Sequence, residues 1–256
     1  MLPREGGRKL YKHLQPHFNE HKIKMGRDKL FDLLRDQHML IEPRRKYKVT
    51  TQSRHRFYTY SNLIKDYVPK KPNQLWVSDI TYLRTQNGFC YLALITDAYS
   101  RKIVGYDVSN SLGLEGTLRA LKSALKTLPD YHTLIHHSDR GLQYCSNAYT
   151  KLLSKNNIRI SMTAKGNCYE NALAERVNGI LKDEFYLDLV FDNIGQAKKT
   201  CSQTIKLYNS KRFHLALDQQ DHVQFPATGT GSKIRNRHIR ETARAHKFPV
   251  AIFKIA

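Results

Sequence analysis

The sequence predicts an α/β protein built on a mixed five-stranded sheet with helices on both faces. The first observation is the order of its periodic segments, which runs strand, strand, strand, helix, strand, helix, strand, helix, helix. The second is the pair Asn87-Gly88 between the first two strand-like segments, which is typical of a hairpin turn. A meander of three strands followed by alternating helices and strands fits a sheet that is partly antiparallel and partly parallel.

Residues 1–45 are expected to form a small helical segment. Leu10 and Leu14 lie four residues apart in a first helix, and a second helix follows Gly26 over residues 27–39. Two short helices with a glycine near the turn fit a helix-turn-helix, although most such pairs are only structural. The segment is therefore either a plain support or a helix-turn-helix-like unit.

A basic linker is expected over residues 46–72. Residues 1–72 contain 18 Lys and Arg against 7 Asp and Glu, and the basic run Arg44-Arg45-Lys46 leads into the linker. A solvated arm is one interpretation, and an arm that follows DNA is the one that the excess of charge favours.

The core is expected over residues 73–217. Runs rich in β-branched and aromatic residues predict strands at 76–83, 89–96, 102–108, 133–137 and 158–162. Apolar residues at helical spacing predict helices at 114–128, 147–155, 171–186 and 194–210. The first of these helices is expected to stop before Pro129.

Composition indicates a polyanionic partner. The chain has 256 residues and a formal net charge of +21, which repels itself unless nucleic acid or an anionic membrane surface neutralises it. Nucleic acid is favoured because no basic amphipathic helix or lipidation motif is evident. The four cysteines show no Cys-x-x-Cys spacing and are expected to be free thiols. With no apolar run long enough to span a bilayer and no signal peptide, we expect a soluble cytoplasmic protein that does not bind membranes.

Three acidic residues form the candidate catalytic site. Asp79 ends the apolar run of the first strand, Asp139 follows the fourth strand, and Glu175 lies on a helix with 35 residues between it and Asp139. If the first and fourth strands are neighbours, the two aspartates converge. Carboxylate oxygens are suitable ligands for Mg²⁺ or Mn²⁺, and two such ions can promote an in-line displacement at a phosphodiester. An isolated acid in either setting is usually a cap or a solvated residue, so spacing by itself leaves both interpretations open.

The helix that carries Glu175 is expected to be amphipathic. Its polar face comprises Asn171, Glu175, Asn178 and Lys182. The face expected to pack on the core comprises Leu173, Val177, Ile180 and Leu181.

Four motifs resemble the catalytic core of bacterial insertion-sequence transposases, specifically the second-reading-frame products of two-frame elements, in the retroviral-integrase superfamily. They are Trp76-x-x-Asp79-Ile80-Thr81-Tyr82, Asp97-x-x-Ser100-Arg101-x-Ile103-Val104-Gly105, His137-Ser138-Asp139-Arg140-Gly141-x-Gln143-Tyr144 and Lys165-Gly166-Asn167-Cys168-x-Glu170-Asn171-Ala172-x-x-Glu175. The resemblance covers residues 73–217, and the stretches Gly7-Arg8-Lys9-Leu10 and Gly26-Arg27-Asp28-Lys29-Leu30 resemble the same family's N-terminal helices.

The resemblance implies a ribonuclease-H-like fold and a metal-binding triad of Asp79, Asp139 and Glu175 holding two Mg²⁺ or Mn²⁺ ions. It implies DNA nicking at an element end, then attack of the freed 3′-hydroxyl on target DNA. It also implies that Lys182 contacts DNA, that a companion protein is encoded in an upstream frame, and that the chain oligomerises on paired double-stranded DNA ends.

Other residues have weaker assignments. Asp97 is expected to hold the turn before Ser100 instead of binding metal, while Glu170 and Glu184 are the alternatives for the third acid. His136 and His137 either assist proton transfer or are hydrogen-bonded structural groups. Lys165 and Asn167 lie in a loop that either contacts DNA or simply enters the helix. The candidate DNA contacts are Lys182, Lys165, Asn167, Asn178, Arg44, Arg45 and Lys46.

The resemblance weakens after residue 217. Residues 218–256 lack the family's Thr-Pro pair and form a basic tail, which is either a diverged terminus or a DNA-binding tail, and the abrupt start is compatible with a truncated copy. Two rival functions remain at this point: a ribonuclease-H-like nuclease without strand transfer, and a DNA-binding remnant that regulates an intact element.

Overall fold

The computed structural model describes residues 6–40, 56–130, 132–164 and 171–212. Within these ranges five strands form one sheet in the order β3-β2-β1-β4-β5, which confirms the predicted fold class. The strands are β1 (Leu75–Thr85), β2 (Gly88–Asp97), β3 (Ile103–Ser109), β4 (Ile135–Ser138) and β5 (Arg159–Met162). The first three pair antiparallel as a meander, and β4 and β5 run parallel to β1.

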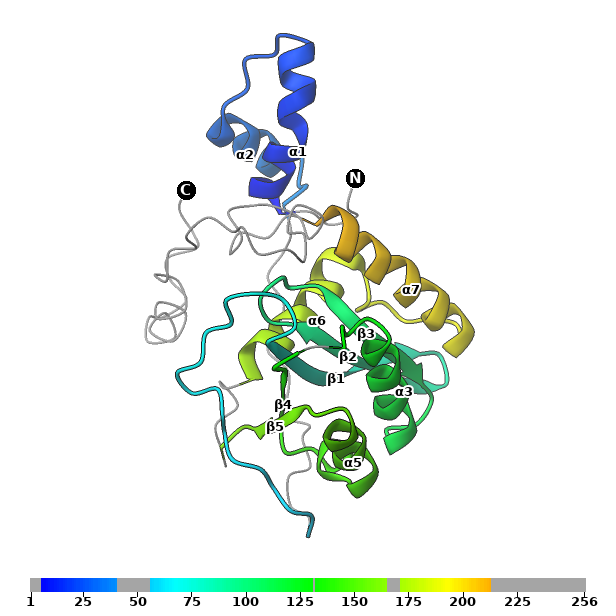
Figure 1. The fold of residues 1–256 in the computed structure, drawn as a ribbon. Helices are drawn as coiled ribbons and strands as arrows, with labels where there is room; N and C mark the ends of the chain where they lie inside the picture. The colour runs from blue at the N-terminus through cyan, green and yellow to red at the C-terminus, as the bar shows by residue number, and fades with distance from the viewer. Residues whose placement is uncertain (1–5, 41–55, 131, 165–170, 213–256) are drawn as a thin grey trace.

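Helices cover both faces of the sheet (Figure 1). The described helices are α1 (Gly7–Glu20), α2 (Arg27–Asp36), α3 (Leu114–Leu125), α4 (Leu142–Cys145), α5 (Asn147–Lys155), α6 (Ala172–Phe185) and α7 (Ile194–Lys211). Leu83, Leu92 and Leu94 of the sheet pack in the cluster that contains buried residues of α6 and α7. Trp76 and Ile95 point the other way, into the cluster formed with α3 and α5. Apolar side chains therefore alternate between two covered faces, as in a sheet enclosed between helices.

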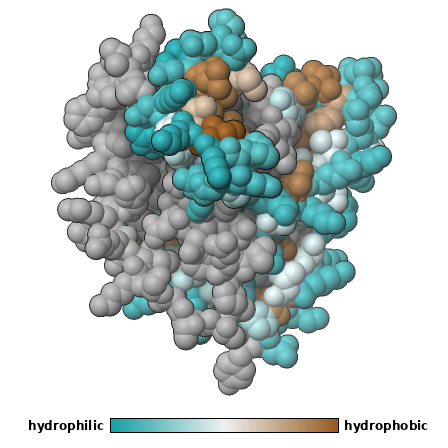
Figure 2. Space-filling view, turned by 90° about the horizontal axis from the view of Figure 1, so that it is seen from above, coloured by the Kyte–Doolittle hydropathy of each residue, from teal (hydrophilic) through white to brown (hydrophobic). Residues whose placement is uncertain are grey.

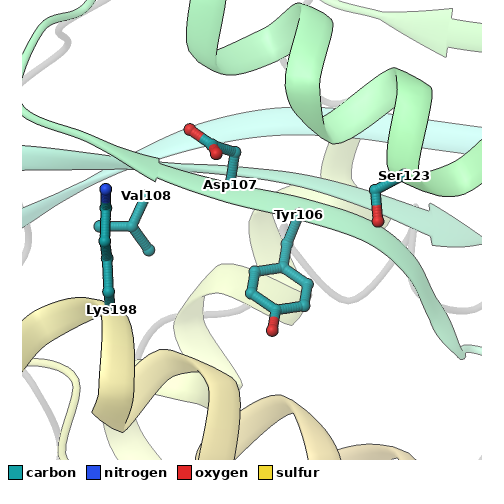
Figure 3. A pocket seen from close by; sticks show the side chains of 5 residues that line it. All are labelled: Tyr106, Asp107, Val108, Ser123 and Lys198. Atoms are coloured by element: carbon teal, nitrogen blue, oxygen red, sulfur yellow. The ribbon is translucent and has the colours of Figure 1, made fainter.

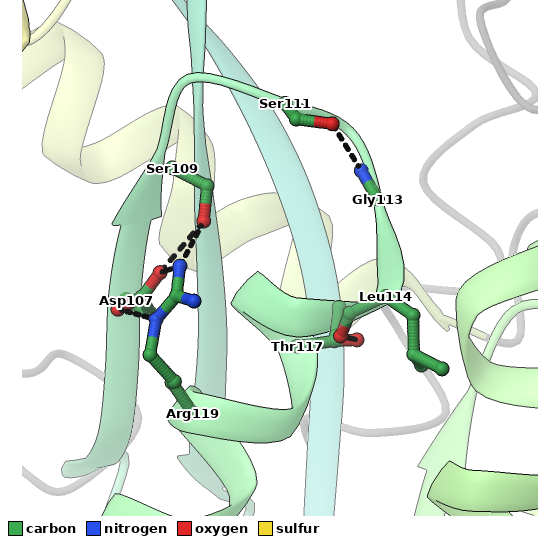
Figure 4. Close-up of polar contacts among 7 residues, drawn as sticks. All are labelled: Asp107, Ser109, Ser111, Gly113, Leu114, Thr117 and Arg119. Carbon is green, nitrogen blue, oxygen red and sulfur yellow. Dashed lines mark hydrogen bonds and ion pairs between the residues drawn. The ribbon is translucent and has the colours of Figure 1, made fainter.

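Helix α3, which follows the three-stranded meander, packs directly on the edge strand β3. A Cβ added at Gly105 of β3 would lie 2.4 Å from the carbonyl oxygen of Ala120, so α3 can approach this closely only where the strand has no side chain. Arg119 of α3 donates from Nε and Nη2 to the carboxylate of Asp107, at 2.9 and 2.8 Å (Figure 4). The same Asp107 accepts the Ser109 hydroxyl at 2.7 Å. These contacts hold α3 against β3.

Several element boundaries differ by a few residues from the sequence prediction, and one short helix was not predicted. The helix predicted to reach residue 128 ends at Leu125, where the chain tightens through a bond from Thr127 N to Ala124 O at 2.9 Å. The second N-terminal helix ends at Asp36 instead of residue 39, because His38 adopts a left-handed φ of 53°. The short helix α4 was not predicted, because its four residues are too few to show the helical spacing of apolar side chains.

The N-terminal helices project from the core, whereas part of the segment that follows them packs on it. Helices α1 and α2 project from the body of the molecule (Figure 1). Ile23 between them, Leu33 on α2 and Met39 just after α2 are exposed. Residues 46–55 of the expected basic linker lie outside the described residues. Part of residues 56–72 packs on the core: Leu63, Ile64 and Tyr67 contact a cluster from β1, β4 and α6, and Leu63 N donates to Ser161 Oγ at 2.9 Å.

On the face seen in Figure 2, the described residues are mainly hydrophilic. Figure 2 shows a hydrophilic face with separate hydrophobic patches. Among the described helices, none combines the length and apolar character needed to cross a membrane. Cys90, Cys145 and Cys201 are buried free thiols, as expected, whereas Cys168 and the tail at 218–256 lie outside the described residues.

Candidate active site

The register of the sheet brings two of the predicted acids together. β1 and β4 pair in parallel up to Ser78 and Ser138. Asp79 and Asp139 are therefore the next residues along these two neighbouring strands of the sheet. β4 ends there while β1 continues to Thr85, which opens the sheet beside the two aspartates. Asp139 Oδ1 accepts the Gly141 N–H at 2.9 Å, which holds the carboxylate at the start of the turn. The convergence expected if the strands are neighbours is thus present.

Helix α6 brings the third acid to the same place. Ala174, Val177 and Leu181 are buried against the sheet, which leaves Glu175 exposed in the first turn of the helix. The start of α6 is tied to β1 because Asn171 Nδ2 donates to the carbonyl of Ser78 at 3.1 Å. Of the four leucine, valine and isoleucine side chains expected on the core face, Val177 and Leu181 are fully buried and the others are partly buried.

The three carboxylates repel one another. Burial raises the pKa of Asp79 from 3.8 to about 7, and the charge of Asp139 adds to this, with a smaller contribution from Glu175. A hydrogen bond from Asn178 Nδ2 to Asp79 Oδ2 at 2.8 Å acts in the opposite direction. Loss of surrounding water raises the pKa of Glu175 as well, and Asp139 again adds to it. Asp139 therefore lies within electrostatic range of both Asp79 and Glu175.

These residues fit a divalent cation. The donors are all carboxylate oxygens, the ligand type preferred by Mg²⁺ and Mn²⁺, and their repulsion is what a cation would relieve. The amide oxygens of Asn171 and Asn178 are buried with no hydrogen-bond partner, a shortage that an ordered water or ion could meet. Within the described ranges, one group of three possible metal ligands has its ligand atoms within 4.8 Å of one another. It comprises the exposed residues His17, Glu20 and His21 at the end of α1, and not the three acids.

Two asparagines complete the site, and the sequence did not identify their role. Asn178 was expected among the DNA contacts, but it is 5% exposed and its amide points into the protein toward Asp79. Asn171 is 3% exposed and joins α6 to β1. The available signal was their spacing from Glu175 on one helix face, which indicates a shared face but not whether that face is buried.

The histidines beside Asp139 are structural in this conformation. His136 Nε2 lies 2.7 Å from Ser78 Oγ and 3.0 Å from the Tyr149 hydroxyl. Burial lowers the pKa of His136 to about 3, and the neighbouring His137 lowers it further, so the ring is neutral. His137 Nδ1 lies 2.8 Å from Ser161 Oγ. Of the two interpretations, the hydrogen-bonded structural one is favoured.

Of the other acids considered as metal ligands, Asp97 and Glu184 have hydrogen-bond partners outside the triad. Asp97 accepts Ser100 N at 2.7 Å, Ser100 Oγ at 2.8 Å and Asn73 N at 2.7 Å, which confirms that it holds the turn after β2. Glu184 binds Lys9 and Arg212, away from the triad. Glu170 lies outside the described residues.

Of the predicted DNA contacts other than Asn178, only Lys182 lies within the described residues. It is half-buried, seven residues beyond Glu175 on α6. The others, Lys165, Asn167, Arg44, Arg45 and Lys46, lie outside the described residues. A separate hollow between β3, α3 and α7 is lined by Tyr106, Asp107, Val108, Ser123 and Lys198 (Figure 3). None of the three acids lines it.

Two family models match the chain, both described as an integrase core domain. They match residues 69–168 and 156–220, so the first spans Asp79 and Asp139 and the second spans Glu175. The chain is 38% identical over 206 residues to an uncharacterised 31 kDa protein of the insertion element IS600 from Shigella sonnei. That alignment covers 80% of this chain and 76% of the relative.

Other relatives match over a shorter span. The chain is 39% identical over 152 residues to the transposase InsF of the insertion sequence IS3A from Escherichia coli K12, covering 59% of this chain and 53% of that protein. Among solved structures, a chain of a simian T-cell lymphotropic virus intasome superimposes with a TM-score of 0.54 at 17% identity. That match covers 89% of this chain and 77% of the other, and it shows a shared fold alone.

Proposed function

The chain belongs to the insertion-sequence transposases that carry an integrase core domain, and from this premise we propose that it cleaves and rejoins DNA at the ends of a mobile element. The proposed reaction has two steps. Water attacks a phosphodiester at the element end and releases a strand with a 3′-hydroxyl. That hydroxyl then attacks a phosphodiester of the target DNA, forms the new bond and releases a second 3′-hydroxyl.

The observation that carries this proposal is the meeting of Asp79, Asp139 and Glu175 from three separate elements. Burial raises the pKa values of Asp79 and Glu175, and the charge of Asp139 raises both further. Groups gathered against their own repulsion are a feature of functional sites, since a stable fold has no need of them. We propose that the three hold two Mg²⁺ or Mn²⁺ ions.

Bound divalent cations supply Lewis-acid activation of the attacking oxygen and charge stabilisation of the leaving oxygen. The chain's own residues supply position. Asn178 holds one oxygen of Asp79, so the carboxylate keeps its orientation when its charge is neutralised. Asn171 fixes the start of α6 on β1 and thereby the height of Glu175 above the sheet. We propose that both asparagines are positioning residues and that neither contacts DNA directly.

The partner we propose is double-stranded DNA, at the element end and at the target. The formal net charge of +21 provides the attraction for the phosphate backbone. Lys182 is placed on the helix of Glu175, and we propose it as a phosphate contact together with Lys165, Asn167, Arg44, Arg45 and Lys46. We further propose oligomers on paired ends, a companion protein from an upstream frame, and action in the cytoplasm, where bacterial DNA lies.

The experiment is strand joining and resolution on a branched DNA oligonucleotide with Mn²⁺ or Mg²⁺, because this substrate depends least on a companion protein. The wild type is compared with Asp139→Asn and Glu175→Gln, and with Glu115→Gln, an exposed acid on α3, as the matched control. We expect metal-dependent joining in the wild type and the control, and a loss of at least about a hundredfold in both triad variants.

Other outcomes assign the rival functions. Cleavage without joining would favour a ribonuclease-H-like nuclease. DNA binding with steep salt dependence that is indifferent to Glu175→Gln, with no turnover, would favour a regulatory remnant. Activity retained in both triad variants would refute the assignment of the site.

A further inference from the structure

A buried acid on the catalytic helix joins two segments far from it in the sequence. Glu184 lies near the end of α6, nine residues beyond Glu175. Its Oε1 accepts Lys9 Nζ from α1 at 2.5 Å and Arg212 Nη2 at 2.9 Å, and its Oε2 accepts Arg212 Nε at 2.7 Å. The three side chains are only 7%, 14% and 6% exposed for Lys9, Glu184 and Arg212.

Three charged side chains can be buried together only if they pair closely, because each loses its contact with water. Burial by itself raises the pKa of Glu184, but the bonds and charges of Arg212 and then Lys9 outweigh it, so the pKa is lowered and the group is charged at neutral pH. Arg212 donates two parallel hydrogen bonds to the Glu184 carboxylate. Its guanidinium carbon also lies 5.7 Å from the ring centre of Tyr208 on α7. The pair of Glu184 and Arg212 therefore joins α6 to the end of α7 without Lys9.

Lys9 then adds the N-terminal helices to this unit. It is the buried residue of α1, a helix whose other residues are exposed or half-buried. A lysine is the least expected residue at such a position, because its charge must be desolvated. The chain thus ties its projecting helix pair to the helix of Glu175 through an ion pair that spans 175 residues of sequence.

We propose that the helix-turn-helix-like α1–α2 pair itself contacts DNA, and that Glu184 is a positioning residue that fixes this pair to the catalytic helix, so that DNA bound by the pair would reach the triad in a set orientation. This inference rests on the proposed function. The helix acts as a rigid rod with the third acid of the triad at one end and the attachment of α1 at the other.

The test releases α1 and leaves the core attachment in place. Lys9→Met removes the charge but keeps a chain of similar length, and the Glu184–Arg212 pair remains. The matched control is Lys126→Met, the same substitution at an exposed lysine after α3. Hydrogen exchange of α1 measures the attachment, and steady-state kinetics on the branched DNA oligonucleotide with Mn²⁺ measure its consequence.

We expect Lys9→Met to increase exchange in α1 and to raise KM about tenfold with kcat within about twofold of wild type, the pattern of a lost tether between binding units. Lys126→Met should change neither. Unchanged α1 exchange, or a fall in kcat with KM unchanged, would overturn the proposal. If the wild type joins no DNA, the proposed function fails, yet the exchange measurement still tests the attachment.

A second variant separates positioning from folding. Glu184→Gln leaves two buried cations without their carboxylate, so it is expected to unfold more readily than Lys9→Met. In the Glu184→Gln background, Lys9→Met should have a smaller effect on α1 exchange than it has in the wild type, because the ion pair is already broken. Equal effects in both backgrounds would show that Lys9 does not act through Glu184.

Discussion

Replacement of Asp79 by asparagine should stabilise the metal-free protein at neutral pH while it abolishes the proposed activity. Asparagine has nearly the same shape, and its amide oxygen can still accept the bond that Asn178 donates at 2.8 Å. The substitution removes the charge that burial and Asp139 oppose. A gain in stability with a loss of function is expected where a protein keeps repelling groups together for its chemistry.

The magnitude follows from the pKa of Asp79, which rises from 3.8 to about 7 in the folded state. Each unit corresponds to about 1.4 kcal/mol, so ionising this group in the folded protein costs on the order of 2–4 kcal/mol once its neighbours are allowed to relax. Because the folded pKa is raised, the contribution to stability is fully present below pH 3.8 and is lost as the pH rises through about 7.

The assay is urea unfolding of wild type and Asp79→Asn at about pH 4.5 and pH 8 in the presence of a chelator. The difference in the free energy of unfolding between the two proteins should shift by about 2–4 kcal/mol in favour of the variant from the lower to the higher pH. Groups that titrate equally in both proteins cancel in this difference. Adding Mn²⁺ at pH 8 should stabilise the wild type and leave the variant nearly unchanged.

Two results would refute this reasoning. A difference that does not change with pH would mean that Asp79 titrates normally and is not crowded by the other acids. A shift in the opposite direction would mean that a cation of the chain already neutralises it. Glu115→Gln, at an exposed position on α3, should show no such pH dependence and controls for the loss of one negative charge.

Two further predictions concern how α3 is held on the sheet, and both use the same unfolding assay. Gly105→Ala should destabilise the protein by about 1–3 kcal/mol, because the added methyl would lie 2.4 Å from the Ala120 carbonyl oxygen; a change below about 0.5 kcal/mol would show that α3 does not sit this close. Arg119→Ala should cost less than about 1 kcal/mol, since Arg119 is 53% exposed in its pair with Asp107; a loss above about 2 kcal/mol would contradict this.

The sequence by itself determined the order of strands and helices and identified the three acids. Strand and helix periods are local patterns, and the core elements predicted from them match the structure to within a few residues. The acids could be identified because they stand at the ends of those elements and in motifs shared with a known family. The order of strands and helices also indicated that helices cover both faces of the sheet.

The tertiary structure decided which residues meet. The parallel register of β1 and β4 sets Asp79 beside Asp139, and helix packing determines that Asn178 faces Asp79 and not solvent. The link between Lys9 and Glu184 spans 175 residues and leaves no periodic trace in the sequence. Such contacts depend on how whole elements pack, and packing is a property of surfaces brought together from distant segments. Local pattern therefore predicted the elements and the candidate acids, while only the folded chain showed how the acids are held.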